Sequence, residues 1–133
     1  MIDIETLIYT PIAQAIRTEY PNGSVSGEYV RKPSGFPHVQ ITEMDNYTSM
    51  DERSTATTEK VSTVMYEVNI YSNLQTGKKA ECRNIMSLID GMMYARNFTR
   101  IAMTPVPNLE DSSIYRITAR YRAKTDGTKM YRI

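Results

Sequence analysis

The chain of 133 residues has few of the side chains on which most catalytic and metal sites depend. It contains one cysteine, Cys82, and one histidine, His38. A lone cysteine cannot form an internal disulfide, and a structural zinc site needs four Cys or His ligands, so the sequence excludes both. Glycine-rich phosphate loops, nucleotide fingerprints and HExxH motifs are missing as well. A catalytic Cys–His pair is formally possible, but Cys82 falls on the apolar stripe of a predicted helix, where a buried thiol is the ordinary interpretation.

A dominant charge sign and long hydrophobic runs are also lacking. Sixteen Lys and Arg residues against fifteen Asp and Glu residues give a formal net charge of +1, so the composition does not favour a nucleic-acid-binding protein. No apolar run approaches the roughly 18 residues that a membrane-spanning helix needs. The acidic N-terminal stretch is unlike a signal peptide. We therefore expect one soluble domain over residues 1–133, in a reducing compartment, with no cofactor, metal or membrane partner.

The strongest pattern in the sequence covers residues 61–96. Between residues 61 and 71, apolar side chains occupy alternate positions, which predicts a strand with one face on a core. The apolar positions of this strand are Val64, Tyr66, Val68 and Ile70. After a polar break, apolar side chains recur at three- and four-residue steps, which predicts an amphipathic helix. The helix stripe consists of Cys82, Ile85, Met86, Ile89, Met92 and Met93. We expect this stripe to pack on the apolar face of the strand.

The N-terminal part predicts one helix and two strands. Residues 2–19 carry a helical stripe, which Pro11 should kink or divide. Residues 24–31 form a weak strand pattern that is broken by a glycine. A second strand is expected at about 37–48, joined to the first as a hairpin, with His38 partly exposed.

The C-terminal part predicts two or three further strands. A short strand is expected from residue 98 to Pro105, and a long one over residues 113–125. The Asp126-Gly127 turn then predicts a hairpin and a short last strand at residues 129–133. The fold class is thus α+β, with a mainly antiparallel sheet of about five strands and two helices packed on one face, in the order helix, strands, helix, hairpin.

One face of the predicted strand 113–125 carries a run of basic residues, namely Arg116, Arg120, Arg122 and Lys124. One interpretation is a solvated face whose charges pair with acids on a neighbouring strand. The other is an interaction surface for an acidic partner, a neighbouring subunit or DNA. Like charges directly opposite each other on a sheet are unfavourable, so acidic groups or water must face this run.

A polar segment at residues 49–60 joins two predicted strands. Ser, Thr and charged residues dominate it, including Asp51, Glu52 and Arg53. Such a loop buries too little to fold on its own. It is either a hairpin tip or a segment that contacts a neighbouring subunit.

The pattern from Tyr66 to Lys124 resembles the small tail-terminator, or tail-completion, proteins of long-tailed bacteriophages. The stretches that carry the resemblance are YEVNIYS, AECRNIMSLIDGMM and NFTRIAMTPVPNLEDSSIYRITARYRA. The family has an N-terminal helix, a strand hairpin, a long strand, a helix and a C-terminal hairpin. The present chain follows that order over nearly its whole length.

The resemblance implies a structural virion protein without enzyme activity. Such proteins form a homo-oligomeric ring, usually a hexamer, at the head-proximal end of the tail tube. The ring ends tube polymerisation and presents a surface to the head–tail connector, and DNA passes through its lumen without specific binding. The implied location is the tail or neck of the virion, with assembly in the cytoplasm of the host bacterium. The basic strand face and the polar loop become candidate contacts with neighbouring subunits or the lumen.

Two alternatives remain open from the sequence. One is a head-closure or other neck adaptor protein of similar size. The other is a small bacterial module that binds a ligand or a protein in a pocket enclosed by the apolar strand–helix face.

Overall fold

A computed structural model describes residues 1–48, 61–107 and 111–133. Two helices, α1 (Glu5–Glu19) and α2 (Lys78–Ala95), combine with a six-stranded sheet in an α+β fold. The strands are β1 (Ser24–Ser26), β2 (His38–Thr48), β3 (Ser62–Ser72), β4 (Thr99–Val106), β5 (Tyr115–Thr125) and β6 (Met130–Tyr131). Neither helix is long and apolar enough to cross a membrane, within the residues described.

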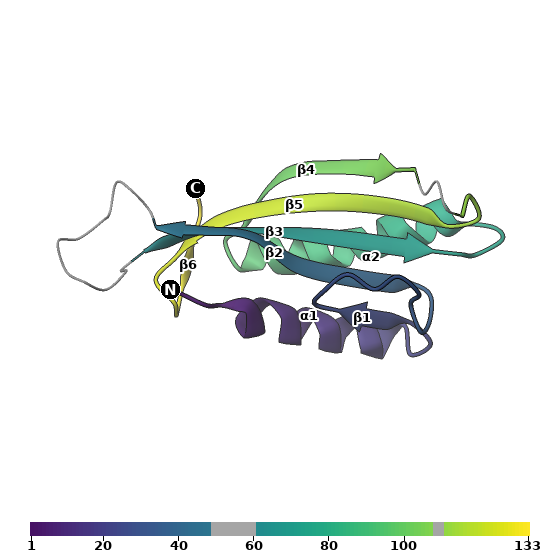
Figure 1. Cartoon of the computed structure of the whole chain (residues 1–133), viewed down its shortest axis with the longest axis horizontal. Coiled ribbons are helices and arrows are strands. Elements are labelled where there is room, and N and C mark those ends of the chain that lie inside the picture. The colour runs from purple at the N-terminus through teal and green to yellow at the C-terminus, as the bar shows by residue number, and fades with distance from the viewer. Residues whose placement is uncertain (49–60, 108–110) are drawn as a thin grey trace.

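The sheet has the strand order β1-β2-β3-β5-β4, and β6 pairs with the end of β5 (Figure 1). The long central strands β3 and β5 pair antiparallel over their whole length, from Ser62 opposite Thr125 to Ser72 opposite Tyr115. Strand β2 runs antiparallel to β3, and β4 antiparallel to β5. Because directly paired residues point to the same side, this register fixes which side chains share a face.

One face of the sheet forms the core with both helices. Alternate residues of β2, β3 and β5 point to this face, and Val68 lies between Ile41 and Ala119 in it. Helix α1 contributes Ile8, Ile12 and Ile16, and α2 contributes Cys82, Ile85, Met86, Ile89 and Met93, all buried in the same hydrophobic cluster. The apolar stripes that the sequence shows at 61–71 and 82–93 are thus the two sides of this core. On the opposite face of the sheet the described residues form no helix, and we call it the helix-free face.

The sheet is mixed and has six strands where about five are expected: four strand pairs are antiparallel, but β1 and β2 pair parallel, which corrects the expected hairpin between residues 24–31 and 37–48. Strand β1 is only three residues long and pairs parallel with β2, Ser24 opposite His38. The eleven-residue connection between the two strands is long enough to return the chain to the same end of the sheet, where Ser24 N donates to Pro37 O at 3.0 Å. A two-residue turn would have forced antiparallel pairing, and none is present.

Helix α1 continues through Pro11 as one helix, so of the two outcomes that the sequence predicts there, a kink or a division, the division is wrong. Because proline has no N–H, the helix lacks the hydrogen bond to the carbonyl four residues earlier, which here is that of Leu7. Leu7 is on the exposed side of α1, so water can hydrate that carbonyl. The buried residues Ile8 and Ile12 lie on either side of the proline and hold both halves on the sheet.

Two irregularities change the simple alternation of the outer strands. Register shifts occur in β2 between Glu43 and Asp45, and in β4 between Arg100 and Ala102. Strand β4 also extends through Pro105, which the sequence pattern places at its end. A proline is tolerated there because β4 is an edge strand.

Candidate interaction surface

The helix-free face brings together the four basic residues that the sequence singles out. Arg116, Arg120, Arg122 and Lys124 all lie on β5 and point to this face. Their partners across the β3–β5 ladder are Tyr71, Glu67, Met65 and Thr63, in that order. The basic run is therefore not a purely solvated stripe, since each member has a defined neighbour on β3.

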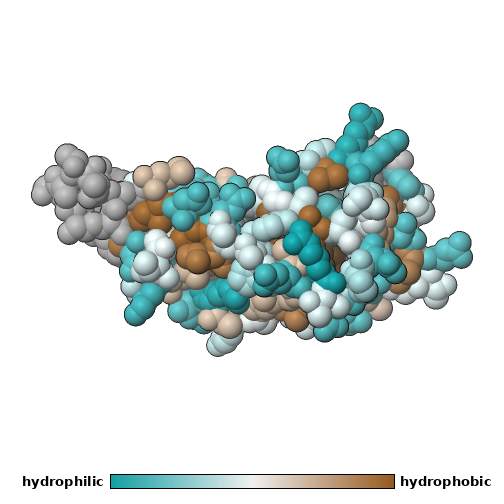
Figure 2. Space-filling model, turned by 90° about the horizontal axis from the view of Figure 1, so that it is seen from below, coloured by the Kyte–Doolittle hydropathy of each residue, from teal (hydrophilic) through white to brown (hydrophobic). Residues whose placement is uncertain are grey.

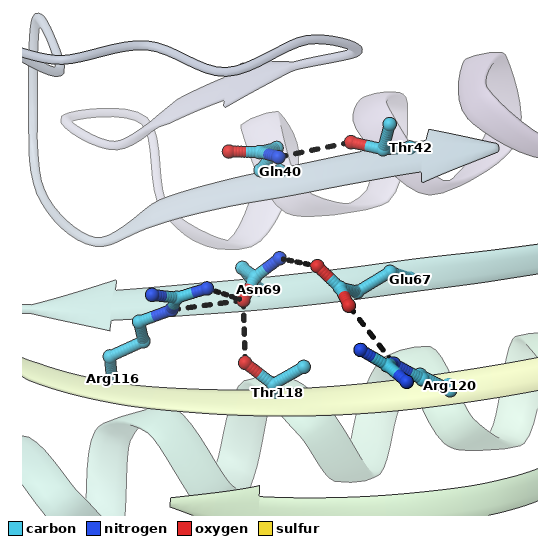
Figure 3. A network of polar contacts seen from close by, with 7 residues as sticks. All are labelled: Gln40, Thr42, Glu67, Asn69, Arg116, Thr118 and Arg120. Carbon is cyan, nitrogen blue, oxygen red and sulfur yellow. Dashed lines mark hydrogen bonds and ion pairs between the residues drawn. The ribbon is translucent and has the colours of Figure 1, made fainter. Parts of the chain in front are cut away.

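Asn69 lies at the centre of a polar network on this face (Figure 3). Its Oδ1 atom accepts hydrogen bonds from Arg116 Nε at 3.0 Å, Arg116 Nη2 at 2.8 Å and Thr118 Oγ1 at 2.5 Å. Its Nδ2 atom donates to Glu67 Oε1 at 2.9 Å. Asn69 is only 1% exposed, although neither α1 nor α2 covers it. The long side chains around it provide the cover, and its amide oxygen and its amide nitrogen both make hydrogen bonds.

Glu67 extends the network to a second arginine. Its Oε2 atom lies 3.1 Å from Arg120 Nε, and the two side chains are 16% and 47% exposed. Glu67 therefore accepts from Asn69 with one oxygen and from Arg120 with the other. The result is a continuous chain of contacts from Arg116 through Asn69 and Glu67 to Arg120, which fixes the separation of the two guanidinium groups.

Tyr71 supports Arg116 from the other side. The Arg116 guanidinium lies over the Tyr71 ring, 5.5 Å from its centroid, and the His38 ring lies 5.9 Å away from the same ring. Burial raises the pKa of the Tyr71 hydroxyl, while the nearby Arg116 charge opposes this shift. The aromatic side chain thus stays neutral and acts as a platform for the cation.

Arg122 and Lys124 continue the basic run toward the other end of β5. Arg122 is half-buried between Met65 on β3 and Thr99 on β4. Its Nε atom has no hydrogen-bond partner among the described residues. This placement packs the Arg122 stem beside the apolar Met65 side chain.

The arrangement is suited to binding anionic groups. The Nε atoms of Arg116 and Arg120 donate to Asn69 and Glu67 within the protein. Other N–H groups of the two guanidinium groups can therefore bind carboxylates or phosphates of a partner. Against the four basic residues, the described part of the face carries two acids, Glu67 and Asp45. Arginines held in place by neighbours lose less conformational entropy when they bind a partner.

His38 and Cys82 are on opposite faces of the sheet, so they cannot act as a catalytic pair. The Sγ atom of Cys82 lies in the core, 3.7 Å from the carbonyl oxygens of Ile70 and Tyr115, and burial raises the pKa of the thiol to about 12. Within the described residues, no group of three His, Cys, Asp or Glu side chains could hold a metal ion.

His38 is buried, at 2% exposure, where the sequence pattern predicts a partly exposed residue. Its Nδ1 atom lies 2.6 Å from Ser24 Oγ, and its Nε2 atom lies 3.2 Å from Ser26 Oγ. The Ser24 hydroxyl also donates to Gly35 O at 2.7 Å, and the Ser26 hydroxyl donates to Glu28 O at 2.8 Å, so both serines link the imidazole to backbone carbonyls. His38 on β2 thus contacts two serines of β1. The parallel pairing of β1 with β2 buries the histidine.

The candidate residues of the polar loop, Asp51, Glu52 and Arg53, lie outside the residues that the structure describes. The sequence analysis missed the roles of Asn69, Glu67 and Tyr71. Their alternation on the polar side of the strand is visible in the sequence, but their relation to the arginines depends on the β3–β5 register. In comparisons with known proteins, no protein-family model and no curated protein matches the chain.

Proposed function

We propose that the protein is a structural subunit of a phage virion, which forms a ring at the head-proximal end of the tail. The ring ends polymerisation of the tail tube and joins the tail to the head connector. Its partners are further copies of the chain, six in a closed ring, together with the tail tube protein and the connector. The proposal includes no catalytic activity, and it places assembly in the cytoplasm of the host bacterium.

The helix-free face is the observation that supports this proposal most directly. A six-stranded sheet carries both of its helices on one side, and the other side holds arginines anchored by Asn69 and Glu67. Such a face is suited to a flat, charged contact with another protein or with DNA in a lumen. The order of helices and strands, which resembles that of the tail-terminator proteins, supports the same function.

A ligand-binding module is the weaker alternative. That hypothesis requires a pocket between the apolar strand face and the helix. In the structure this interface is filled by fully buried side chains, among them Tyr66, Ile89 and Tyr121. Charged side chains line the surface hollow beside α2, which suits contacts with a protein better than a closed apolar site. A head-closure or other neck adaptor protein would use the same kind of surface, so it remains the second candidate.

Tail-tube capping tests the proposal. Purified protein is added to tubes growing from the tail tube protein of the same phage, and tube lengths and tube ends are measured by electron microscopy. We expect tubes to stop growing and to carry a ring at one end. Binding to the head connector, with no effect on tubes, would indicate the head-closure alternative. Binding to neither would contradict both virion functions.

A further inference from the structure

The charges of the described residues are divided unevenly between the two lateral edges of the sheet. Residues 1–48, which form α1, β1 and β2, contain six acidic and three basic side chains. The acidic ones are Asp3, Glu5, Glu19, Glu28, Glu43 and Asp45, and the basic ones are Arg17, Arg31 and Lys32. Residues 61–107 and 111–133 contain five acidic and eleven basic side chains. The near-neutral chain is therefore negative in one part and positive in the other.

These two parts lie on opposite sides of the molecule. In the strand order, β1 and β2 are at one end and β4 at the other, with β3 and β5 between them. Figure 1 shows α1 and β1 along the lower side and β4 along the upper side. The charge division thus runs across the strands, from one edge of the sheet to the other.

The negative side has a hollow beside the N-terminal half of α1. Its lining includes Glu5, Tyr9, Gly27 and Glu28, and its volume is about 390 Å³. Glu5 and Glu28 are both exposed. The pKa of Glu43 is raised mainly by burial and further by the negative charges of its neighbours on this side. We call Glu5, Glu28 and this hollow the acidic side. Seen from α1, the surface is mostly hydrophilic, with hydrophobic side chains in separate areas (Figure 2).

The positive side has a smaller hollow between α2 and β4. Its volume is about 180 Å³, and Arg83, Asp90 and Arg100 contribute to its lining. Asp90 is already engaged, because its Oδ1 atom lies 3.2 Å from Arg100 Nη1 and accepts a hydrogen bond from Tyr121 Oη at 2.9 Å. Arg83 and Lys79, one turn apart on the exposed face of α2, make no side-chain hydrogen bond or ion pair with the described residues. We call Lys79, Arg83, Arg100 and this hollow the basic side.

We propose that the basic side of one copy docks against the acidic side of a second copy, head to tail. The inference rests on the proposed function, because it assigns the surfaces by which copies of the subunit join. Opposite charges attract across such a contact and orient the partners before they touch. A two-fold contact would place like side against like side and is disfavoured by repulsion. A head-to-tail contact of one kind either closes into a ring or continues as a filament.

The contact is made by side chains rather than by extending the sheet. Strand β4 has a register shift at Arg100 and Ala102, and Pro105 has no N–H to donate. Strand β2 has its own register shift beyond Glu43. Irregular edges with proline are typical of strands protected against open-ended pairing. Docking through charges therefore joins copies without a continuous inter-subunit sheet.

Charge reversal on each side tests the inference. One double variant carries Glu5→Lys and Glu28→Lys, the other Lys79→Glu and Arg83→Glu, and Lys129→Glu in the turn before β6 is the matched control. Mass is measured against protein concentration at low and high ionic strength, by light scattering and native mass spectrometry. We expect the wild type and the control to associate at low salt and less so at high salt. Each double variant should need at least about tenfold more protein to associate.

Mixing supplies the decisive measurement. The first double variant is positive on both sides and the second is negative on both, so an equimolar mixture should associate again in alternating order. Loss of association through misfolding would not be rescued in this way. A wild type that stays monomeric at low salt, variants that associate like the wild type, or a mixture that does not associate would each overturn the inference. Copies that join as expected but do not cap tail tubes would contradict the proposed function alone.

Discussion

Asn69 shows how a single neutral side chain can organise a charged surface. It is buried on the helix-free face and makes four hydrogen bonds, three of them accepted from Arg116 and Thr118. Without these hydrogen bonds, the Arg116 side chain would be free to sample many rotamers. The amide holds it against Tyr71 and links it to Glu67, so the geometry of the basic run depends on a residue that carries no charge.

Replacing Asn69 by alanine should lower the free energy of unfolding by about 1–3 kcal/mol, because it leaves polar partners without their bonds. Urea denaturation measures the change. Gln40 is the matched control, since it carries the same amide group, lies directly opposite Asn69 in the sheet and makes one side-chain bond, to Thr42 at 3.0 Å. Gln40→Ala should lower the free energy of unfolding clearly less than Asn69→Ala. Equal losses for the two variants would mean that the network contributes nothing beyond burial.

His38 should make stability depend on pH. Burial lowers its pKa below the usual 6.5, and a hydrogen bond to the Ser24 backbone opposes the shift only in part. The unfolded chain therefore binds a proton more readily than the folded one. The contribution is fully present above about pH 6.5 and is lost as the pH falls toward the lowered pKa of the folded state.

We expect the free energy of unfolding to fall between pH 7.5 and pH 5.5 in the wild type, and to change less in His38→Gln. The difference between the two proteins isolates the histidine, because Glu43 has a raised pKa and contributes with the opposite sign. Denaturant titrations across this range supply the measurement. Parallel pH profiles for the two proteins would show that His38 does not titrate differently on folding.

Helix α2 is the element on which the core depends most. Its buried stripe lies against β3 and β5, and Ile89 at its centre is completely buried. Ile89→Asp would bury an unpaired carboxylate there. The expected loss exceeds about 4 kcal/mol, which is enough to unfold many domains of this size.

The neighbouring Leu88 offers the control for that variant. It is also apolar but 36% exposed, so Leu88→Asp should leave the melting temperature close to that of the wild type. Circular dichroism and thermal melting compare the two. A folded Ile89→Asp protein with native-like melting would show that the stripe is not part of the core.

Elements with a regular period were predictable from the sequence, and the irregular ones were not. The apolar positions of β3, β5 and α2 predict these elements correctly, because each of them packs one complete face on the core. The direction of β1 depends on where an eleven-residue connection ends, which local patterns do not encode. The continuity of α1 through Pro11 is decided by its packing, and the burial of His38 follows from the parallel pairing of β1.

The candidate surface was predictable in part for the same reason. The alternation within β5 is enough to place Arg116, Arg120, Arg122 and Lys124 on one face. Which residues of β3 lie opposite them requires the register between strands that are separated by a helix and a further strand. Asn69 and Glu67 could therefore be recognised as polar positions but not as the anchors of the arginines.

At the scale of the whole molecule, the helix-free face and the two lateral sides point in different directions. The face belongs to β3 and β5 in the middle of the sheet, and the sides belong to its edges. Copies joined side to side would leave their helix-free faces uncovered. The assembly would then present its arginines together, to whatever lies on that side of the ring.

Removing charge from the helix-free face should therefore affect capping and spare the joining of copies. In the variant Arg120→Gln with Arg122→Gln, the folded protein should lose only about 1 kcal/mol, because the Arg120 side chain is 47% exposed, although its partner Glu67 is 16% exposed. Arg17→Gln with Lys129→Gln removes two exposed charges elsewhere and is the matched control. We expect both proteins to associate like the wild type, while only the first fails to stop tube growth in the electron microscope. If the first variant also loses association, the face itself joins the copies, and the division of roles between face and sides is wrong.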